Sequence, residues 1–175
     1  QAAFERKPAW RARAPEDIWQ VNDLGQGLFT QNLQTECGDF VVRRADGVYV
    51  YQLAVTVDDG EAGVTEVVRG MYLLGSAPRQ MYLQALFGFK HPQDGHVPML
   101  LSSDGRRLSK RDKDLDLGVL RQHISPEALI GVLAYSAGLI PKNEPLSAKE
   151  LATVFDWSKL QKEAIYLDGA GLLNP

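Results

Sequence analysis

The densest group of charged side chains in the sequence is the segment RRLSKRDK at residues 106–113. Five of its eight positions are Arg or Lys, although the whole chain has a formal net charge of −3. Such a run is most often a solvated surface loop. This one directly follows the apolar stretch HVPMLL and SSDG, and open α/β sheets bind ligands at the carboxyl ends of their strands. A mobile ammonium such as Lys110 could there stabilise a departing pyrophosphate if the loop closes during the reaction.

Adjacent carboxylates at Asp58 and Asp59 form a second candidate site, since paired carboxylates can hold a hard cation such as magnesium. Asp also favours turns after strands for purely local reasons, and we expect the turn. The single cysteine, Cys37, allows neither an internal disulfide nor a cysteine-based zinc site, and the three histidines are scattered. We therefore expect no metal site and no zinc in this segment, in a reducing, cytoplasmic setting.

Length and composition limit the class of protein. A chain of 175 residues with 45% hydrophobic and 23% charged residues is typical of one globular domain, or one and a half. A pI near 5.6 excludes a generally basic nucleic-acid coat, so any RNA contact must come from local patches. No apolar run approaches the roughly 18 to 20 residues that cross a bilayer, and the opening residues lack the apolar segment of a secretory signal. We expect no membrane association.

The first part of the sequence predicts mostly strands. The first 35 or so residues are polar and loosely patterned, with no clear element. Residues 39–60 then predict two strands joined by a hairpin turn at Asp46-Gly47, and the run 48–57 is apolar enough to be a buried strand. GVTEVVRG, ending at Gly70, predicts a third strand.

A helix is predicted next, from an N-cap at Ser76 to Gly88, with Pro78 in its first turn. HVPMLL predicts a fourth strand, and the strand–helix–strand order suggests a parallel crossover. Arg79 could contact nucleotide or RNA, but a place on the helix surface is the favoured interpretation.

Beyond residue 113 the sequence predicts helices. Ser125-Pro126-Glu127 and the capping box Ser147 to Glu150 are helix starts, and Ser158 to Gln161 repeats the second pattern. Gly138 is expected to end the first of these helices. We therefore expect an α/β portion to about residue 105 and a small helical portion after it, joined by the basic loop.

The basic segment has a specific resemblance. RRLSKR looks like the KMSKS loop of class I aminoacyl-tRNA synthetases, in the form used by the glutamyl group. Three more stretches occur in the right order: GDFVVRRADGVYVYQLAVTVDD, GVTEVVRG and LLGSAPRQMYLQALFG. Together they are similar to the glutamyl-tRNA synthetase family over roughly residues 36–140. Within that family, the chain most resembles the short glutamyl-queuosine tRNA(Asp) synthetases. It shares their sequence YQLAV, and no anticodon-binding region follows its helices.

The resemblance implies roles for five residues. Tyr51 matches the tyrosine of the glutamate pocket, and Arg69 matches the arginine that faces the side-chain carboxylate of glutamate. Lys110 matches the second lysine of the KMSKS loop and carries the catalytic role, and Arg107 stands where the first lysine usually lies. Ser109 lies beside Lys110 in the ATP-binding loop. Without the resemblance, the favoured interpretation of Tyr51 is an aromatic side chain of a strand, packed in the core. For Arg69, a surface ion pair is then as good an interpretation as a ligand-binding role.

Two departures qualify the resemblance. Tyr72 stands where the family commonly has aspartate, and nothing in residues 1–50 resembles the HIGH motif that binds ATP. The chain therefore resembles the C-terminal half of a synthetase, with the N-terminal half of the catalytic domain missing. We expect a remnant of the acceptor-binding insertion at 1–38, the second half of a Rossmann-type fold at 39–105, the KMSKS-like loop at 106–113 and a helical stem-contact region at 114–175.

The implied reaction is that of the family. A full enzyme would activate L-glutamate with ATP, as its Mg²⁺ complex, and transfer the glutamate to tRNA. Half an ATP site cannot position the α-phosphate for in-line attack, so we expect the chain alone to be inactive. The alternative is a non-catalytic tRNA- or partner-binding module on a synthetase scaffold. A P-loop hydrolase is disfavoured, because no G-x-x-x-x-G-K-[ST] motif occurs.

Overall fold

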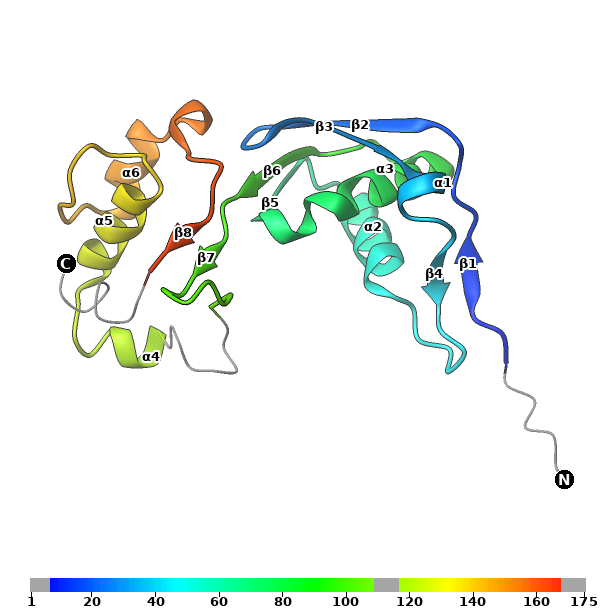
Figure 1. Cartoon of the computed structure of the whole chain (residues 1–175), viewed down its shortest axis with the longest axis horizontal. Coiled ribbons are helices and arrows are strands. Elements are labelled where there is room, and N and C mark those ends of the chain that lie inside the picture. The colour runs from blue at the N-terminus through cyan, green and yellow to red at the C-terminus, as the bar shows by residue number, and fades with distance from the viewer. Residues whose placement is uncertain (1–6, 109–116, 168–175) are drawn as a thin grey trace, which may run out of the picture. The chain divides into compact units, whose positions relative to one another are not determined.

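The computed structural model describes residues 7–108 and 117–167. The chain divides into two compact units, Gln1–His96 and Val97–Pro175 (Figure 1). The predicted Rossmann-type segment 39–105 therefore extends into both units. None of the helices within the described ranges is long and apolar enough to span a membrane.

The first 35 residues contain strands that the sequence analysis missed. Strand β1 (Trp10–Ala12) pairs antiparallel with β4 (Phe40–Arg43), and β2 (Ile18–Asp23) forms a hairpin with β3 (Gly27–Asn32). A short helix, α1 (Leu33–Glu36), follows the hairpin. The prediction was wrong because one of the inward positions of β2 is a buried aspartate, Asp23, which hides the apolar alternation. Gly27 opens β3 with a φ of 83°.

The predicted buried strand at 48–57 is also wrong. The Asp46-Gly47 turn is present, with Gly47 at a φ of 93°. After the turn, only one isolated bridge, between Arg43 and Tyr49, replaces the predicted strand pairing. Helix α2 (Tyr51–Ala62) follows this bridge. It ends at Gly63, which adopts the left-handed conformation. Its β-branched residues favour a strand locally, but packing against a second helix outweighs a weak propensity. Asp58 and Asp59 consequently lie in this helix and not in a turn.

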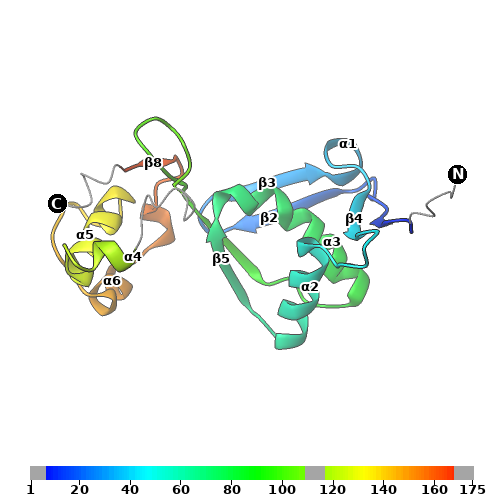
Figure 2. The ribbon, with the colours of Figure 1, turned by 90° about the horizontal axis from the view of Figure 1, so that it is seen from below.

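The third predicted strand and the helix after it are confirmed, but the fourth predicted strand is not. Strand β5 (Glu66–Gly70) leads through a 3₁₀ helix, η1 (Met71–Ser76), into α3 (Ala77–Phe87), which ends at Gly88. Ser76 makes no capping hydrogen bond, because it closes η1 in a helical conformation. HVPMLL is not one strand: β6 (Gln93–Val97) ends before Pro98, and β7 (Leu100–Leu101) begins after it. Strand β5 pairs with β6. Figure 2 shows the other pair of this unit's longer strands, β2 and β3, side by side.

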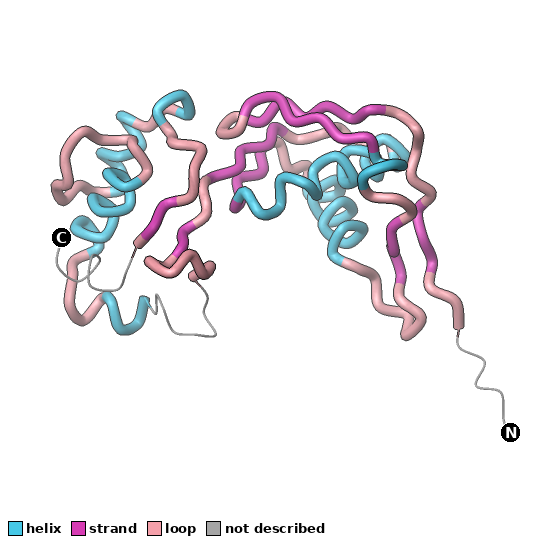
Figure 3. Tube along the Cα trace, viewed as in Figure 1, coloured by secondary structure: helices cyan, strands magenta, loops and turns pink. Residues whose placement is uncertain are grey.

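The second unit is mainly helical in its described residues (Figure 3). It contains α4 (Leu117–Leu120), α5 (Pro126–Ser136), α6 (Ala148–Val154), the 3₁₀ helix η3 (Trp157–Lys159) and the strand β8 (Ile165–Tyr166), which pairs in parallel with β7. The Ser125 cap and the Ser147 capping box are confirmed. The third predicted start is wrong, since Asp156 caps η3 one residue before Trp157. A local pattern cannot tell a single 3₁₀ turn from a helix.

Helix α5 packs so closely at Gly131 that a side chain there has no room. A Cβ at this position would lie 2.9 Å from the carbonyl carbon of Glu144 and closer still to its oxygen. We expect Gly131→Ala to lower the free energy of unfolding by about 1 to 3 kcal/mol, despite the better helix propensity of alanine. Gly75→Ala, which would meet nothing within 4 Å, is the matched control for denaturation. Equal stability of the two variants would contradict this packing.

Candidate active site

Arg69, on β5, is held by three neighbouring side chains. Its Nε donates to His96 Nε2 at 2.9 Å and its Nη1 donates to Gln80 Oε1 at 2.7 Å. Its Nη2 forms an ion pair with Asp94 Oδ1 at 3.7 Å, and the side chain is 11% exposed. The interpretation of Arg69 as a surface ion pair does not fit this burial.

A fully buried histidine connects Arg69 to the β2–β3 hairpin. His96 is 0% exposed, and its Nδ1 lies 2.5 Å from Asp23 Oδ2. Because the Arg69 Nε always donates, His96 Nε2 must accept, which places the imidazole proton on Nδ1 facing Asp23. The guanidinium is therefore oriented by a histidine that a carboxylate orients in turn.

The Asp23 carboxylate accepts more than this one hydrogen bond. Its Oδ1 accepts from the backbone N–H groups of Gly25, Gln26 and His96, at 2.9, 2.8 and 3.0 Å. Burial by itself raises the pKa of Asp23, but the hydrogen bonds from His96 and Gln26 outweigh it and hold the pKa below its usual value. Asp23 is thus a charged anchor in the turn of the hairpin.

Tyr51 is the first residue of α2 and is 48% exposed. Its phenol has no hydrogen-bond partner among the residues that the structure describes, so the interpretation as a core aromatic of a strand is wrong. The start of α2 is nevertheless tied to Arg69 through Gln80, which donates to Gln52 Oε1 at 2.8 Å and accepts from Arg69. One glutamine thus links the neighbour of Tyr51 to the guanidinium.

The guanidinium keeps donors for a ligand. It carries five N–H groups, and the contacts with His96 and Gln80 use two of them. The Asp94 oxygen is too distant from Nη2 for a hydrogen bond, and the other Asp94 oxygen lies 3.0 Å from His91 Nε2. One N–H on Nη1 and two on Nη2 remain, which is the fork that binds a carboxylate through two parallel bonds.

The basic segment lies in the second unit and opens as a tight hairpin. Arg107 bridges back to Leu101, and Ser102 donates its backbone N–H to Arg106 O at 2.8 Å. Gly105 supplies the left-handed conformation of this turn, with a φ of 82°. Ser109 and Lys110 lie outside the described residues.

Sequence reasoning missed the residues that position Arg69. Gln80 is one of several polar residues in a helix, and His96 was read only as one of three scattered histidines. Asp23 lies 73 positions from His96. The available signal was a histidine inside the apolar stretch HVPMLL, where a buried polar side chain needs a partner.

Three further sequence expectations concern Tyr72, a metal site and Arg79. Tyr72, which stands where the family has aspartate, is 59% exposed in η1, and its ring lies so close to Gly70 that a Cβ there would come within 2.9 Å of it. Across residues 7–108 and 117–167, no three His, Cys, Asp or Glu side chains are grouped to hold a metal ion. Arg79 contacts Ser76 Oγ and Gly75 O, at 3.2 and 3.3 Å.

The chain is similar to curated proteins named glutamyl-Q tRNA(Asp) synthetase. The glutamyl-Q tRNA(Asp) synthetase of Symbiobacterium thermophilum is 49% identical over 162 residues, which cover 91% of this chain and 50% of that protein. The same enzyme of Pseudomonas putida (strain GB-1) is 43% identical over 134 residues, covering 77% and 45%. The chain thus spans about half the length of these curated relatives.

Solved structures and a family model extend the comparison. The crystal structure of a glutamate tRNA ligase from Elizabethkingia meningosepticum, in complex with its amino acid, superposes with a TM-score of 0.76 at 26% identity, over 93% of this chain and 36% of that one. The model of the catalytic domain of class I tRNA synthetases (E and Q) matches residues 1–172. Since that match spans nearly the whole chain, Arg69 and its neighbours lie in a member of the class I tRNA synthetase family for glutamate and glutamine.

Proposed function

We propose that the protein containing this chain activates glutamate with ATP in the cytoplasm and transfers the glutamate to tRNA. The acceptor is the queuosine of tRNA(Asp), as the names of the relatives suggest, or tRNA(Glu). The observation that carries the proposal is the buried Arg69 guanidinium, fixed by His96 and Gln80 with three N–H groups left over. A fixed fork of this kind suits the planar side-chain carboxylate of glutamate.

Each of the other site residues has a role in this proposal. Tyr51 donates one more hydrogen bond to the amino acid, from the end of α2 that Gln80 links to Arg69. Lys110 stabilises the negative charge that develops on the phosphates as pyrophosphate leaves, and Ser109 and Arg107 hold ATP beside it. Bound Mg²⁺ would enter with ATP and shield the phosphate charge. In this proposal the chain supplies the second half of a Rossmann-type fold and a helical region that contacts the tRNA stem.

The 175-residue chain by itself is expected to give no glutamate-dependent exchange of labelled pyrophosphate into ATP above background. Arg69 can hold a carboxylate, but the reaction also needs the α-phosphate aligned with the attacking oxygen, and half a site cannot provide that alignment. The assay measures labelled ATP with and without glutamate. The complete Symbiobacterium thermophilum relative is the positive control, and clear exchange by the chain would show that its site is already whole.

The second candidate function is a non-catalytic tRNA-binding or partner-binding module. Tyr72 favours it, because an aromatic ring stands where the family commonly places a carboxylate. This candidate predicts tRNA binding that weakens steeply with salt, and no exchange activity even when the N-terminal half is supplied. Restored exchange in the longer protein would exclude it.

A further inference from the structure

A cation lies between two aromatic rings on the β1–β4 ribbon. Trp10 and Arg43 are partners in the pairing of β1 with β4, and Arg43 forms the bridge with Tyr49. The three side chains form one row across neighbouring strands. The Arg43 guanidinium carbon lies 5.2 Å from the Trp10 ring centroid and 5.3 Å from that of Tyr49, both within cation–π range.

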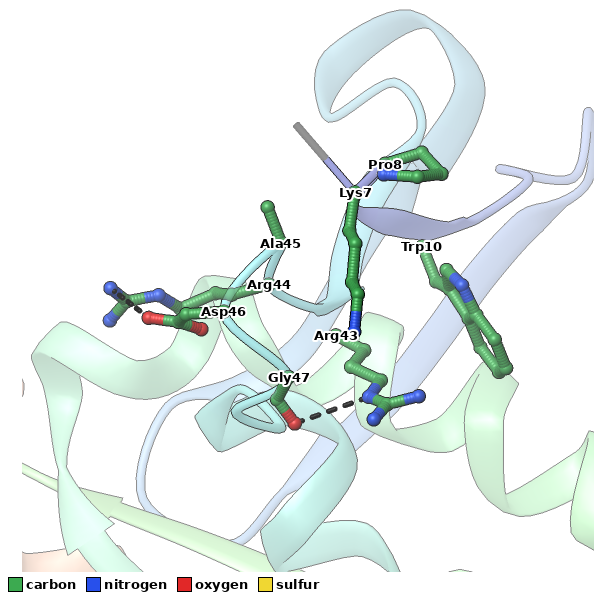
Figure 4. A pocket seen from close by; sticks show the side chains of 8 residues that line it. All are labelled: Lys7, Pro8, Trp10, Arg43, Arg44, Ala45, Asp46 and Gly47. Atoms are coloured by element: carbon green, nitrogen blue, oxygen red, sulfur yellow. Dashed lines mark hydrogen bonds and ion pairs between the residues drawn. The ribbon is translucent and has the colours of Figure 1, made fainter. Parts of the chain in front are cut away.

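Two features keep this row in place. The Arg43 Nε donates to Gly47 O at 3.1 Å, a bond drawn in Figure 4. Gly47, in the left-handed conformation, turns the chain back so that Tyr49 meets Arg43. The arrangement is therefore built into the turn and does not depend on a ligand.

The outer parts of both rings remain in water. Trp10 is 58% exposed and Tyr49 is 56% exposed, so neither ring serves the hydrophobic core. Beside the row lies a hollow of about 550 Å³, which we call the Trp10 groove, lined by Lys7, Pro8, Trp10 and residues 43–47 (Figure 4). Its volume falls in the range of about 300 to 1,000 Å³ typical of small-ligand sites.

The Trp10 groove is positively charged in an acidic chain. Its cations are Lys7, Arg43 and Arg44, and its one carboxylate is Asp46, which pairs with Arg44 at 2.7 Å. Lys7 and Arg43 remain as surplus charge, whereas the whole chain carries −3. Exposed rings beside surplus cations suit a ligand with a flat apolar face and an attached anion.

We propose that the Trp10 groove binds an unpaired nucleobase of RNA together with its phosphate. The base stacks on the Trp10 ring and extends the row of planes, and Lys7 and Arg43 contact the phosphate. RNA-binding proteins commonly stack splayed-out bases on aromatic side chains and Arg planes, and cations track the backbone. An acidic peptide would use the charge but not the two exposed rings. The inference rests on the proposed function, which makes tRNA the partner. It adds that an unpaired nucleotide of the RNA binds in the Trp10 groove.

The test measures binding of two fluorescein-labelled RNAs to the 175-residue chain by anisotropy. One is a hairpin with an unpaired loop, and the other is a fully paired duplex of the same charge. Trp10→Ala is expected to weaken binding of the RNA hairpin about tenfold, because stacking one base contributes about 1 to 3 kcal/mol. Tyr49→Ala leaves Arg43 with one ring partner and should weaken this binding by a smaller factor. Duplex binding should change by less than about twofold, since paired bases offer no free face.

Two controls separate stacking from damage to the fold. Trp10→Phe keeps a ring and should bind the hairpin within about threefold of the original chain. Tyr135→Ala removes a ring that is 49% exposed in α5 and does not line the groove, and it should bind as the original does. Lys7→Ala should weaken both RNAs and reduce the salt dependence of binding.

The possible failures are distinguishable. If the original chain binds the hairpin and both alanine variants bind it equally well, the groove is not the site and the proposed function stands. If Trp10→Ala weakens binding of the duplex and of the RNA hairpin by the same factor, the groove contacts phosphates only and the proposed stacking is wrong. If the original chain binds neither RNA, this inference fails, whereas glutamate-dependent exchange by the longer protein still decides the proposed activity.

Discussion

Replacing Asp23 with alanine lowers the expected free energy of unfolding of the chain by about 3 to 5 kcal/mol, the largest stability effect we predict. The carboxylate accepts from three backbone N–H groups and from the His96 imidazole, at a site that is 5% exposed. Alanine leaves these donors buried without partners. Urea denaturation followed by circular dichroism measures the change. Asp58→Ala, at an exposed carboxylate of α2, should stay within about 0.5 kcal/mol of the original.

Asp23→Asn separates the loss of charge from the loss of shape. Asparagine can still accept the backbone bonds, but its amide N–H₂ then faces the His96 Nδ1–H. If His96 moves its proton to Nε2, that proton faces the Arg69 Nε–H, so one donor–donor contact persists in either tautomer. We expect a loss of about 1 to 3 kcal/mol, smaller than for alanine. An asparagine variant as stable as the original would contradict the position of the His96 ring between Asp23 and the Arg69 Nε–H.

The contribution of Asp23 also depends on pH. Its pKa is lowered in the folded chain, because the hydrogen bonds from His96 and Gln26 outweigh the opposing effect of burial. The unfolded chain has a pKa near 3.9 at such a group. The stabilisation is therefore complete above about pH 4 and disappears as the pH falls through the folded pKa. The stability gap between the original and Asp23→Ala should narrow over that acidic range.

Local signals in the sequence predicted the elements whose ends are fixed by one or two residues. Gly88 ends α3, Ser125 caps α5, and the Ser147 box starts α6, because each satisfies backbone groups within a few positions. The prediction of a strand at residues 48–57 failed because the deciding contact is not local. Its branched residues look like a strand, but α2 forms because it packs against α3, and no local pattern contains that contact.

In the candidate site, too, residues in recognisable motifs were predicted and their distant partners were not. The resemblance pointed to Arg69 and Tyr51 from their surrounding motifs, and the structure places them on β5 and at the start of α2. The partners of Arg69 come from two other elements, α3 and β6, and Asp23 reaches the site across 73 positions. Such partners are specified by the tertiary fold, which a single sequence does not display. The buried histidine in an apolar stretch was the one readable hint.

Replacing Arg69 with methionine, in a full-length synthetase that carries this chain, is expected to raise KM for glutamate about a hundredfold or more. Methionine approximates the length of the side chain but removes the N–H groups left for a carboxylate, and two charge-assisted hydrogen bonds are worth roughly this factor. KM for ATP should change by less than about threefold, since Arg69 is assigned to the amino acid. The measurement is pyrophosphate exchange at varied glutamate and at varied ATP.

The matched control is Arg79→Met, which removes a guanidinium of the same kind from α3. Arg79 contacts Gly75 O and Ser76 Oγ at the start of its helix. Among the described residues, it bonds to none of the direct partners of Arg69 and is connected to Gln80 only through Ser76 and Gln52. Its variant should retain KM for glutamate, so equal losses in the two variants would mean that Arg69 acts only through stability. Arg69→Lys should fall between them, with a loss of about tenfold, because an ammonium keeps the charge but cannot present a bidentate fork. A lysine variant as active as the original would show that the site needs a positive charge at β5 and not the geometry that His96 and Gln80 impose.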